Sequence, residues 1–397
     1  MTGEPPEVDP DSLIDFVRRL VRIPSVNRPA EGLSEQPAAE AVVAEMRSFG
    51  WEPEVEEVAP GRPNVVCVVE GGLPGPTLMF EGHTDVVTEG DRAEWTHDPF
   101  GAEIVEGRLY GRGAADMKSG LAAMIHATAA VAGAGPFPGR ILLGALCDEE
   151  EMMIGVKHFV ARGYCEGVDG VIVCEPEEGE ICAVSKGAIR LRIDAQGRMA
   201  HGAMPDQGAN PLAALIHLGG GLAALEEELQ GEVGVHPHLG RVFVTPTVVR
   251  GGSFIQMNVI PAEAAMAVDV RTVPALDHGL VLERIGALAA EAGAATGVEL
   301  TVEVVDDRPS TDTPEDSPVV RALVAAHERV TGRPAVFGGV PGSTDGTILW
   351  RDGGLDTVVY GPGGKWIAHQ VDEYVEVDAV IEAARVYVAA ALEFLNR

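Results

Sequence analysis

The chain has 397 residues, enough for one large domain or two ordinary ones, and 46% of them are hydrophobic. Its net charge of −32 argues against nucleic acids and anionic membranes as partners, because binding phosphate groups requires a basic surface. A small anionic substrate is still compatible with this charge, since a single arginine inside a pocket can bind it.

The cysteines and the first ten residues indicate the cellular compartment of the protein. The five cysteines form no Cys-x-x-Cys pair, and Cys67, Cys147 and Cys174 lie in apolar, strand-like runs, as buried reduced thiols do. The segment from Met1 to Pro10 is acidic and proline-rich, unlike a signal peptide, and no apolar run approaches the ~18–20 residues of a membrane span. We therefore expect a soluble, cytoplasmic protein.

The first half of the chain alternates between helix-like and strand-like segments. Amphipathic periodicity predicts four helices: residues 11–21, 36–49, 116–131 and 156–162. Short apolar runs predict four strands: residues 64–69, 77–80, 141–147 and 171–174. This alternation is typical of a mainly parallel sheet covered by helices.

The pattern changes near Lys186. The next segments are predicted as strand, helix, strand, strand, helix and strand: residues 188–195, 210–229, 242–249, 263–271, 280–292 and 299–305. This is the order of a ferredoxin-like split βαβ unit. The earlier alternation returns with helices and a strand: residues 318–330, 357–360 and 377–395. We predict an α/β fold in which a mainly parallel-sheet domain of residues 1–185 and 309–397 is interrupted by an α+β insert of residues 186–308.

Imidazole and carboxylate groups recur at the ends of the predicted strands. His83, the acidic cluster at 148–151, Glu175 and His369 each follow such a strand, and Asp116 begins a predicted helix. The carboxyl ends of parallel strands share one edge of a sheet, so we expect these side chains to converge. A solvated loop is the alternative for His83-Thr84-Asp85 taken alone.

Convergence of these residues would require a counter-charge. Carboxylates repel one another and are costly to bury unless they are paired, and bound metal ions relieve both costs. Imidazole and carboxylate ligands without a thiolate favour zinc in a catalytic site, with cobalt or manganese as alternatives. Two histidines and three carboxylates exceed the needs of one tetrahedral ion, which suggests two ions that share a carboxylate.

Several motifs follow one another along the chain. They are Gly-His-Thr-Asp-Val-Val at 82–87, Gly-Arg-Gly-Ala-Ala-Asp-Met-Lys at 111–118, Asp-Glu-Glu at 148–150, Glu-Pro at 175–176, Gly-Arg-Met-Ala-His at 197–201, Asn-Val-Ile-Pro at 258–261, Gly-Pro-Gly at 361–363 and Ala-His at 368–369. In this order they resemble the M20 family of zinc aminoacyl hydrolases, which includes acetylornithine deacetylase, succinyl-diaminopimelate desuccinylase and glutamate carboxypeptidase. The resemblance covers nearly the whole chain. It implies a homodimer in which residues 1–185 and 309–397 form the catalytic dizinc domain and residues 186–308 form a lid and dimerisation domain.

The resemblance implies a ligand role for each matching residue. His83 and Glu175 would bind one Zn²⁺, and Glu150 and His369 would bind the other. Asp116 would bridge the two ions, and the peptide bond that follows it would be cis. The implied cofactor is therefore two Zn²⁺ per subunit, with Co²⁺ or Mn²⁺ as substitutes.

Three further residues are implied to be catalytic. Asp85 would orient the ring of His83. Glu149 would be the general base that takes a proton as a zinc-bridged hydroxide attacks the amide carbonyl, and it would pass that proton to the leaving amine. His201, from the insert of the other subunit, would donate to the oxyanion. A surface turn residue is the alternative for His201.

The acidic cluster departs from the family pattern. Met152 and Met153 stand where glycines are usual, and Gly202 replaces a usual serine. Aligning the glycine that follows the cluster keeps Glu149 as the base and leaves Glu151 as a solvated loop residue.

Substrate contacts are also implied. Arg271 and Asn258 match family positions that bind a substrate carboxylate, which a guanidinium can hold by two parallel hydrogen bonds. An ion pair at a domain interface is the alternative for Arg271. Thr344 and Gly363 would line the pocket.

The resemblance implies a metal-dependent hydrolase that cleaves the amide bond of an N-acyl amino acid or diamino acid, as a deacetylase or desuccinylase does. A dipeptidase or carboxypeptidase of the same family, with the same metal chemistry, is the nearest alternative. A carbamoylase and a non-catalytic binding member are further alternatives, although none of the implied metal ligands is missing from the chain.

Overall fold

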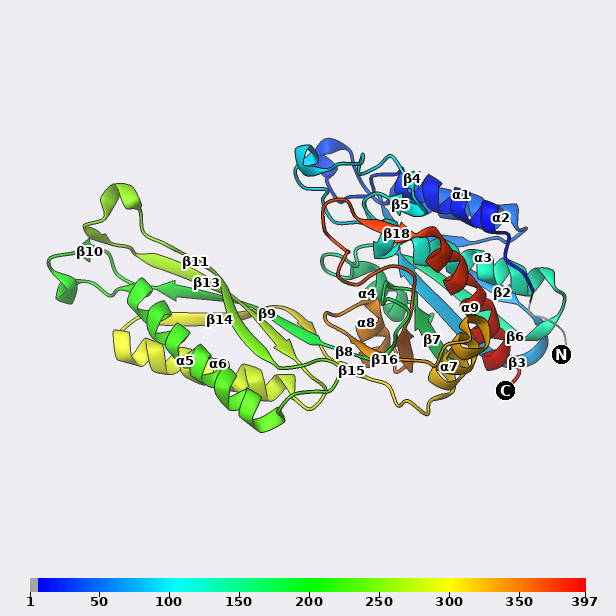
Figure 1. Ribbon diagram of the computed structural model, residues 1–397. Helices are drawn as coiled ribbons and strands as arrows, with labels where there is room; N and C mark the ends of the chain where they lie inside the picture. The colour runs from blue at the N-terminus through cyan, green and yellow to red at the C-terminus, as the bar shows by residue number, and fades with distance from the viewer. Residues whose placement is uncertain (1–5) are drawn as a thin grey trace. The chain divides into compact units, whose positions relative to one another are not determined.

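The computed structural model describes residues 6–397, which form two compact units (Figure 1). The first unit contains the chain up to residue 183 together with 312–340 and 344–397, and the second contains 184–311 and 341–343. The expected boundaries, after 185 and after 308, lie close to these. The first five residues of the segment expected to differ from a signal peptide lie outside the described residues.

Nine strands form the sheet of the first unit. They are β1 (Glu54–Ala59), β2 (Arg62–Glu70), β3 (Gly72–His83), β6 (Phe137–Leu146), β7 (Gly170–Val173), β8 (Ile181–Ser185), β15 (Thr311–Asp312), β16 (Phe337–Val340) and β17 (Thr357–Val359). The strand order is β1-β2-β6-β3-β7-β17-β8-β15, with β16 paired to β8. The central strands β6, β3, β7 and β17 run parallel, while β2 and β8 are antiparallel to their neighbours β6 and β17. The predicted α/β fold with a mainly parallel central sheet is confirmed.

Helices cover both faces of this sheet. They are α1 (Pro10–Val21), α2 (Gln36–Ser48), α3 (Ser119–Gly133), α4 (Ile154–Ala161), α7 (Pro318–Thr331), α8 (Asp345–Arg351) and α9 (Val377–Leu395). Side chains alternate along β3, so Leu78 and Phe80 join the core under α1, α2, α3, α7 and α9, whereas Met79 joins the core under α4 and α8. Burial on both faces explains why residues 77–80 of β3 form a short apolar run in the sequence.

One predicted helix begins later than expected. The periodicity predicted a helix from Asp116, but α3 begins at Ser119, and the preceding turn is the irregular segment η3 (Ala114–Lys118). Asp116 has φ −112° and ψ 100°, which is not helical, and the Asp116–Met117 peptide bond is cis, as the family resemblance implied. Asp116 therefore lies on irregular backbone.

The remaining short elements of the first unit escaped prediction. A three-stranded sheet contains β4 (Glu103–Val105), β5 (Arg108–Tyr110) and β18 (Tyr374–Glu376). Two short 3-10 turns are η1 (Pro29–Glu31) and η2 (Arg92–Glu94). β5 and β18 each contribute one residue to the core, Leu109 and Val375.

The second unit contains the predicted split βαβ order. Its main elements are β9 (Gly187–Gln196), α5 (Pro211–Val233), β11 (Phe243–Gly251), β13 (Glu263–Thr272), α6 (His278–Thr296) and β14 (Glu299–Arg308). The sheet order is β11-β13-β9-β14, with all neighbours antiparallel, and a second core packs α5 and α6 against this sheet. Smaller elements are β10 (Ala200–His201), β12 (Val259–Ile260), η4 (Pro205–Gln207) and η5 (Phe254–Gln256).

Two predictions from composition can be compared with the structure. Across residues 6–397, every helix falls short of the length or the hydrophobicity that a membrane crossing would require. All five cysteines are free thiols, and Cys67, Cys147 and Cys174 are buried as predicted.

Candidate metal centre

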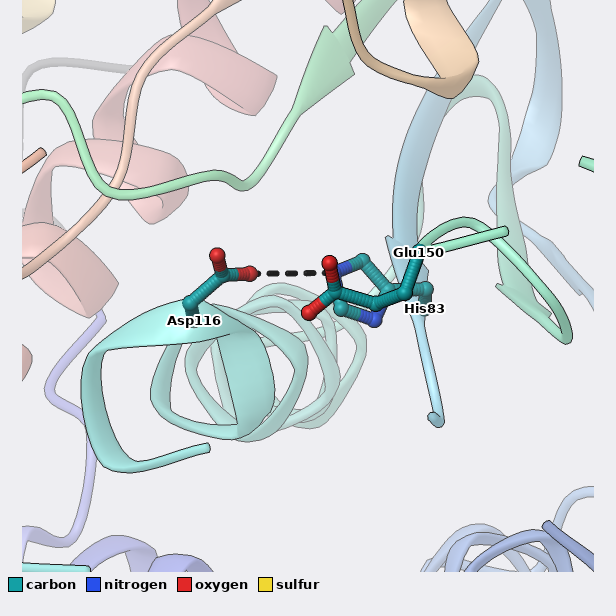
Figure 2. Close-up of side chains that lie close together, drawn as sticks. All are labelled: His83, Asp116 and Glu150. Atoms are coloured by element: carbon teal, nitrogen blue, oxygen red, sulfur yellow. Dashed lines mark hydrogen bonds and ion pairs between the residues drawn. The ribbon is translucent and has the colours of Figure 1, made fainter. Parts of the chain in front are cut away.

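The predicted metal ligands lie together at the carboxyl edge of the parallel strands. His83 is the last residue of β3, so it belongs to the strand that it was expected to follow. Glu150 comes after β6, Glu175 after β7 and His369 after β17, while Asp116 lies in η3. Figure 2 shows the side chains of His83, Asp116 and Glu150 close to one another.

Asp116 lies between two imidazoles. Its Oδ1 is 3.1 Å from His83 Nε2, and its Oδ2 is 3.1 Å from His369 Nε2. Each oxygen of one carboxylate therefore faces a different histidine. A carboxylate that bridges two metal ions needs this arrangement, because each of its oxygens must serve a different ion.

Each histidine also has a second carboxylate neighbour. Glu175 Oε1 is 3.4 Å from His83 Nε2, and Glu150 Oε2 is 3.0 Å from His369 Nε2. The site thus divides into two halves that share Asp116. In each of two groups of residues, the possible ligand atoms lie within 4.8 Å of one another. One group is His83, Asp116 and Glu150, and the other is His83, Glu149 and Glu175.

Electrostatics indicate that this donor set suits cations. Burial and the charge of Asp116 raise the pKa of Glu175 to about 8 and the pKa of Glu150 to about 7. Burial acts to lower the pKa of His83, but the Glu175 and Asp116 carboxylates together raise it well above its usual value. In the absence of metal ions, bound protons therefore offset the negative charge of these carboxylates. Divalent ions would offset the same charge. Nitrogen and oxygen donors without sulfur fit zinc in a catalytic site.

Glu149 differs from its neighbour Glu151. The side chain of Glu149 is buried, and burial together with the charge of Glu175 raises its pKa well above the usual range. A buried carboxylate beside the expected metal ligands is in a position to act as a general base. The Glu151 side chain is 53% exposed and accepts a bond from Asn27 Nδ2 at 2.9 Å, as expected for a solvated loop residue.

Asp85 contacts more of the site than the ring of His83. His83 Nδ1 lies 3.0 Å from the backbone oxygen of Asp85 and 3.5 Å from its Oδ1, so the closer acceptor is the main chain. The two carboxylate oxygens accept the backbone N–H groups of Glu149 at 3.2 Å and Glu150 at 3.1 Å. The Asp85 carboxylate therefore positions the expected base and one expected ligand as well as facing His83.

We expect Asp85→Ala to lower kcat by about 10–100-fold, because groups that orient metal ligands typically contribute that much. Steady-state kinetics with metal-loaded protein measures this effect. Asp9→Ala is a matched control, since the Asp9 carboxylate also accepts two backbone N–H groups, at the start of α1. Equal losses of activity in the two variants would contradict a specific role for Asp85.

The loop after the acidic cluster is anchored through Arg62 and Glu35, two residues that sequence reasoning missed. Arg62 donates to Glu35 at 2.7 Å and pairs with Asp148. Asp148 Oδ2 in turn accepts the N–H groups of Met152 at 3.2 Å and Ile154 at 3.1 Å. The ion pair therefore fixes the strand end from which Glu149 and Glu150 project.

One of the two methionines of this loop has a backbone conformation that favours glycine. Met153 has φ +54°, in the left-handed region, and its side chain is buried, whereas Met152 is exposed. The backbone conformation therefore explains a preference for glycine at position 153.

The predicted residues of the insert lie in the second unit. The Nδ2 atom of Asn258 is 3.5 Å from His201 Nε2. The N–H of Ala203 donates to His201 Nδ1 at 3.1 Å, which leaves the proton of a neutral ring on Nε2. Arg271 lies apart, near the end of β13, where its guanidinium binds Asp269 through contacts of 2.6 and 3.2 Å.

Two predicted pocket residues belong to the first unit. The buried Thr344 caps α8, and its Oγ1 accepts the N–H of Gly346 at 3.2 Å. Gly363 has φ +96°, and a Cβ atom there would lie 3.0 Å from that of Ala115, so both conformation and space favour glycine. Gly363 also lines a pocket of about 260 Å³ together with Tyr360.

A second acidic cluster carries its own cation. Glu177, Glu180 and Cys182 also bring possible ligand atoms within 4.8 Å. Lys365 Nζ lies 2.8 Å from Glu177 and 2.7 Å from Glu180, so an ammonium group already pairs with both carboxylates. The residues around Asp116 are therefore the better candidate for a metal centre.

Three buried charged residues near the centre were also missed by sequence reasoning: Arg112, Lys118 and Glu373. Arg112 and Lys118 belong to the motif at 111–118, which could have singled them out. Nothing in the sequence distinguishes the buried Glu373 from the partly buried Asp372 beside it.

Comparisons with known proteins agree with this geometry. The profile of peptidase family M20/M25/M40 matches residues 79–393. The chain is 34% identical to a succinyl-diaminopimelate desuccinylase of Caulobacter vibrioides, across 96% of this chain and 95% of that protein. It is 28% identical to a probable succinyl-diaminopimelate desuccinylase of Staphylococcus epidermidis, across 86% and 89%. An M20 family metallo-carboxypeptidase from Sulfolobus solfataricus has the same fold, with a TM-score of 0.78, 20% identity, and coverage of 97% of this chain and 98% of that chain.

Proposed function

The chain belongs to peptidase family M20/M25/M40 and is a hydrolase of linear amides, and on this premise we propose that it uses two metal ions to remove the acyl group of an N-acyl diamino acid, with succinyl as the first candidate. The observation that carries the two-metal proposal is Asp116, whose two carboxylate oxygens each lie 3.1 Å from a different histidine. Similarity to desuccinylases along nearly the whole chain supports the choice of acyl group.

The proposed ligands are His83 and Glu175 for one ion and Glu150 and His369 for the other, with Asp116 shared. When bound, two zinc ions would supply a nucleophilic water at neutral pH and polarise the amide carbonyl, and cobalt or manganese could replace them.

Glu149 is the proposed general base. Its carboxylate takes the proton of the attacking water and returns it to the leaving amine. Asp85 keeps this carboxylate in place by accepting the Glu149 N–H at 3.2 Å. His201, with its ring proton on Nε2, is proposed to donate to the oxyanion.

Arg271 and Asn258 are proposed to bind the substrate carboxylate. Asp269 occupies two of the five N–H donors of the Arg271 guanidinium, and the others are enough for a second carboxylate.

A substrate panel tests the proposed reaction. Metal-loaded protein would be assayed with N-succinyl-L,L-diaminopimelate, N-acetylornithine and a set of dipeptides, with Glu149→Gln protein as the blank for contaminating activity. We expect the highest kcat/KM for the succinylated diamino acid. Turnover of dipeptides alone would replace this proposal with a peptidase of the same family.

A homodimer formed through the second unit is part of the proposal. β11 is an edge strand of the sheet β11-β13-β9-β14, and its outward backbone groups can pair with another strand. Val249 on β11 is 56% exposed, and Ile216 on the adjacent helix α5 is 77% exposed. An exposed edge with apolar side chains supports pairing with a second copy, in which His201 would serve the other subunit.

We expect Val249→Lys to convert the dimer to a monomer, because a charged side chain on an edge strand opposes pairing. Light scattering coupled to size-exclusion chromatography measures the mass. Val304→Lys on β14, the other edge of the same sheet, is the matched control and should remain dimeric, since Val304 is also exposed. A monomeric wild-type protein, or dissociation by the control alone, would contradict the proposed interface.

The cytoplasm is the proposed site of action. All five cysteines are free thiols, a state that reducing conditions maintain.

A further inference from the structure

Two short segments of the first unit each carry a proposed metal ligand at one end. Residues 112–116 end with Asp116, and residues 369–373 begin with His369. The opposite ends hold Arg112 and Glu373, which are buried to 2% and 0% exposure. Arg112 Nη1 donates to Glu373 Oε2 at 2.5 Å, and we call this ion pair the clasp.

Each residue of the clasp also forms a hydrogen bond to the proposed metal-binding residue of the opposite segment. Arg112 Nη2 donates to the backbone oxygen of His369 at 3.3 Å. Glu373 Oε1 accepts the N–H groups of Asp116 at 3.0 Å and Ala115 at 2.9 Å, and its other oxygen accepts the N–H of Gly113 at 3.1 Å. The two ligand segments are therefore cross-linked reciprocally through one ion pair.

The ligands joined in this way lack support from regular structure. His83 belongs to β3, where the ladder to β6 fixes its backbone. Asp116 and His369 lie on irregular backbone, and His369 has φ +65° and a side chain that is 51% exposed. Packing therefore constrains His369 weakly, and the clasp supplies a constraint that the sheet does not.

A purely structural role explains these bonds less well. Burying an ion pair costs desolvation free energy, and a well-packed apolar pair of similar volume often stabilises a fold as well or better. The side-chain bonds found for Glu373 go to the segment that ends in Asp116, and Arg112 joins that segment to His369. This arrangement fits a role in setting the distance between the two metal-binding residues Asp116 and His369.

We propose that Arg112 and Glu373 are positioning residues that hold His369 at the correct distance from Asp116 and thereby set the affinity for the ion bound by Glu150 and His369. The inference rests on the proposed two-metal site. It assigns the clasp chiefly to this ion, because Arg112 bonds to the ligand His369, whereas in the described part of the chain no hydrogen bond or ion pair joins the clasp to His83 or Glu175.

The test is a calorimetric titration of metal-free protein with Zn²⁺ alone. Arg112→Lys keeps the charge beside Glu373 but loses the planar fork that reaches His369. We expect one of the two Zn²⁺ affinities to fall by about 10–100-fold, as is typical when a partner of a metal ligand is removed. The Zn²⁺ affinity that stays unchanged should equal the one affinity that His369→Ala protein retains. This match identifies the weakened ion as the one that His369 binds.

Glu373→Gln provides a second variant, and it decides the outcome should Arg112→Lys not fold. Glu45→Gln is the matched control, because Glu45 is another buried glutamate of the first unit, paired with Arg19 at 2.5 Å and His126 at 3.0 Å. Two unchanged affinities in both clasp variants, or an equal loss in the control, would overturn the clasp. Fewer than two ions in the wild-type protein would instead overturn the proposed two-metal function.

Discussion

Glu149→Gln is expected to lower kcat by about 10³–10⁴-fold while two metal ions stay bound. The variant keeps the size of the side chain but cannot accept the proton of the attacking water, and positioned general bases contribute up to about this factor. Glu149 is the buried carboxyl next to Glu175 and His83, and burial and the Glu175 charge raise its pKa. Steady-state kinetics and metal analysis by inductively coupled plasma spectrometry measure the two quantities on the same sample.

Glu151→Gln is the matched control, because it makes the same substitution two residues away on a half-exposed side chain. It should retain activity within about twofold of wild type. Activity retained by Glu149→Gln and lost by Glu151→Gln would mean that the register of the three consecutive glutamates has been misassigned. Loss of a metal ion from Glu149→Gln would mean that Glu149 is a ligand.

Asp116→Ala is expected to weaken the binding of both metal ions by at least about 100-fold and to abolish turnover. Removing a residue that merely orients a ligand typically costs 10–100-fold in affinity, and Asp116 is the proposed ligand of both ions. Its removal also leaves His83 and His369 without the carboxylate oxygen that lies 3.1 Å from each. Zn²⁺ titration of the metal-free variant measures both affinities.

Asp15→Ala serves as the control for the loss of a carboxylate. Asp15 lies in α1, pairs with Arg19 at 3.1 Å and is exposed, so its removal should leave both Zn²⁺ affinities unchanged. Retention of one ion at wild-type affinity in Asp116→Ala would show that Asp116 serves one ion only, and the shared-carboxylate account would fail.

Much of the fold was predictable because its elements follow simple periodicities. α9 was predicted over 377–395 and spans Val377–Leu395. The start of α3 was predicted wrongly, since the apolar periodicity continues through Asp116 although the backbone there is not helical. Short strands such as β4 and β18 were missed because a three-residue strand is defined by its pairing partner and not by its own residues.

The site was predictable to the extent that its groups lie at strand ends. His83, Glu175 and His369 were found in this way, and motif order supplied their roles. Glu373 was not found, because its importance comes from three backbone N–H groups and Arg112, which no sequence pattern marks. The contacts of Asp85 with Glu149 and Glu150 were missed for the same reason.

Anomalous scattering at the zinc absorption edge from crystals of the zinc-loaded protein tests the two-metal account most directly. We predict two peaks, one next to His83 and Glu175 and one next to Glu150 and His369, with Asp116 in contact with both. A single peak at full occupancy, or peaks away from Asp116, would contradict it.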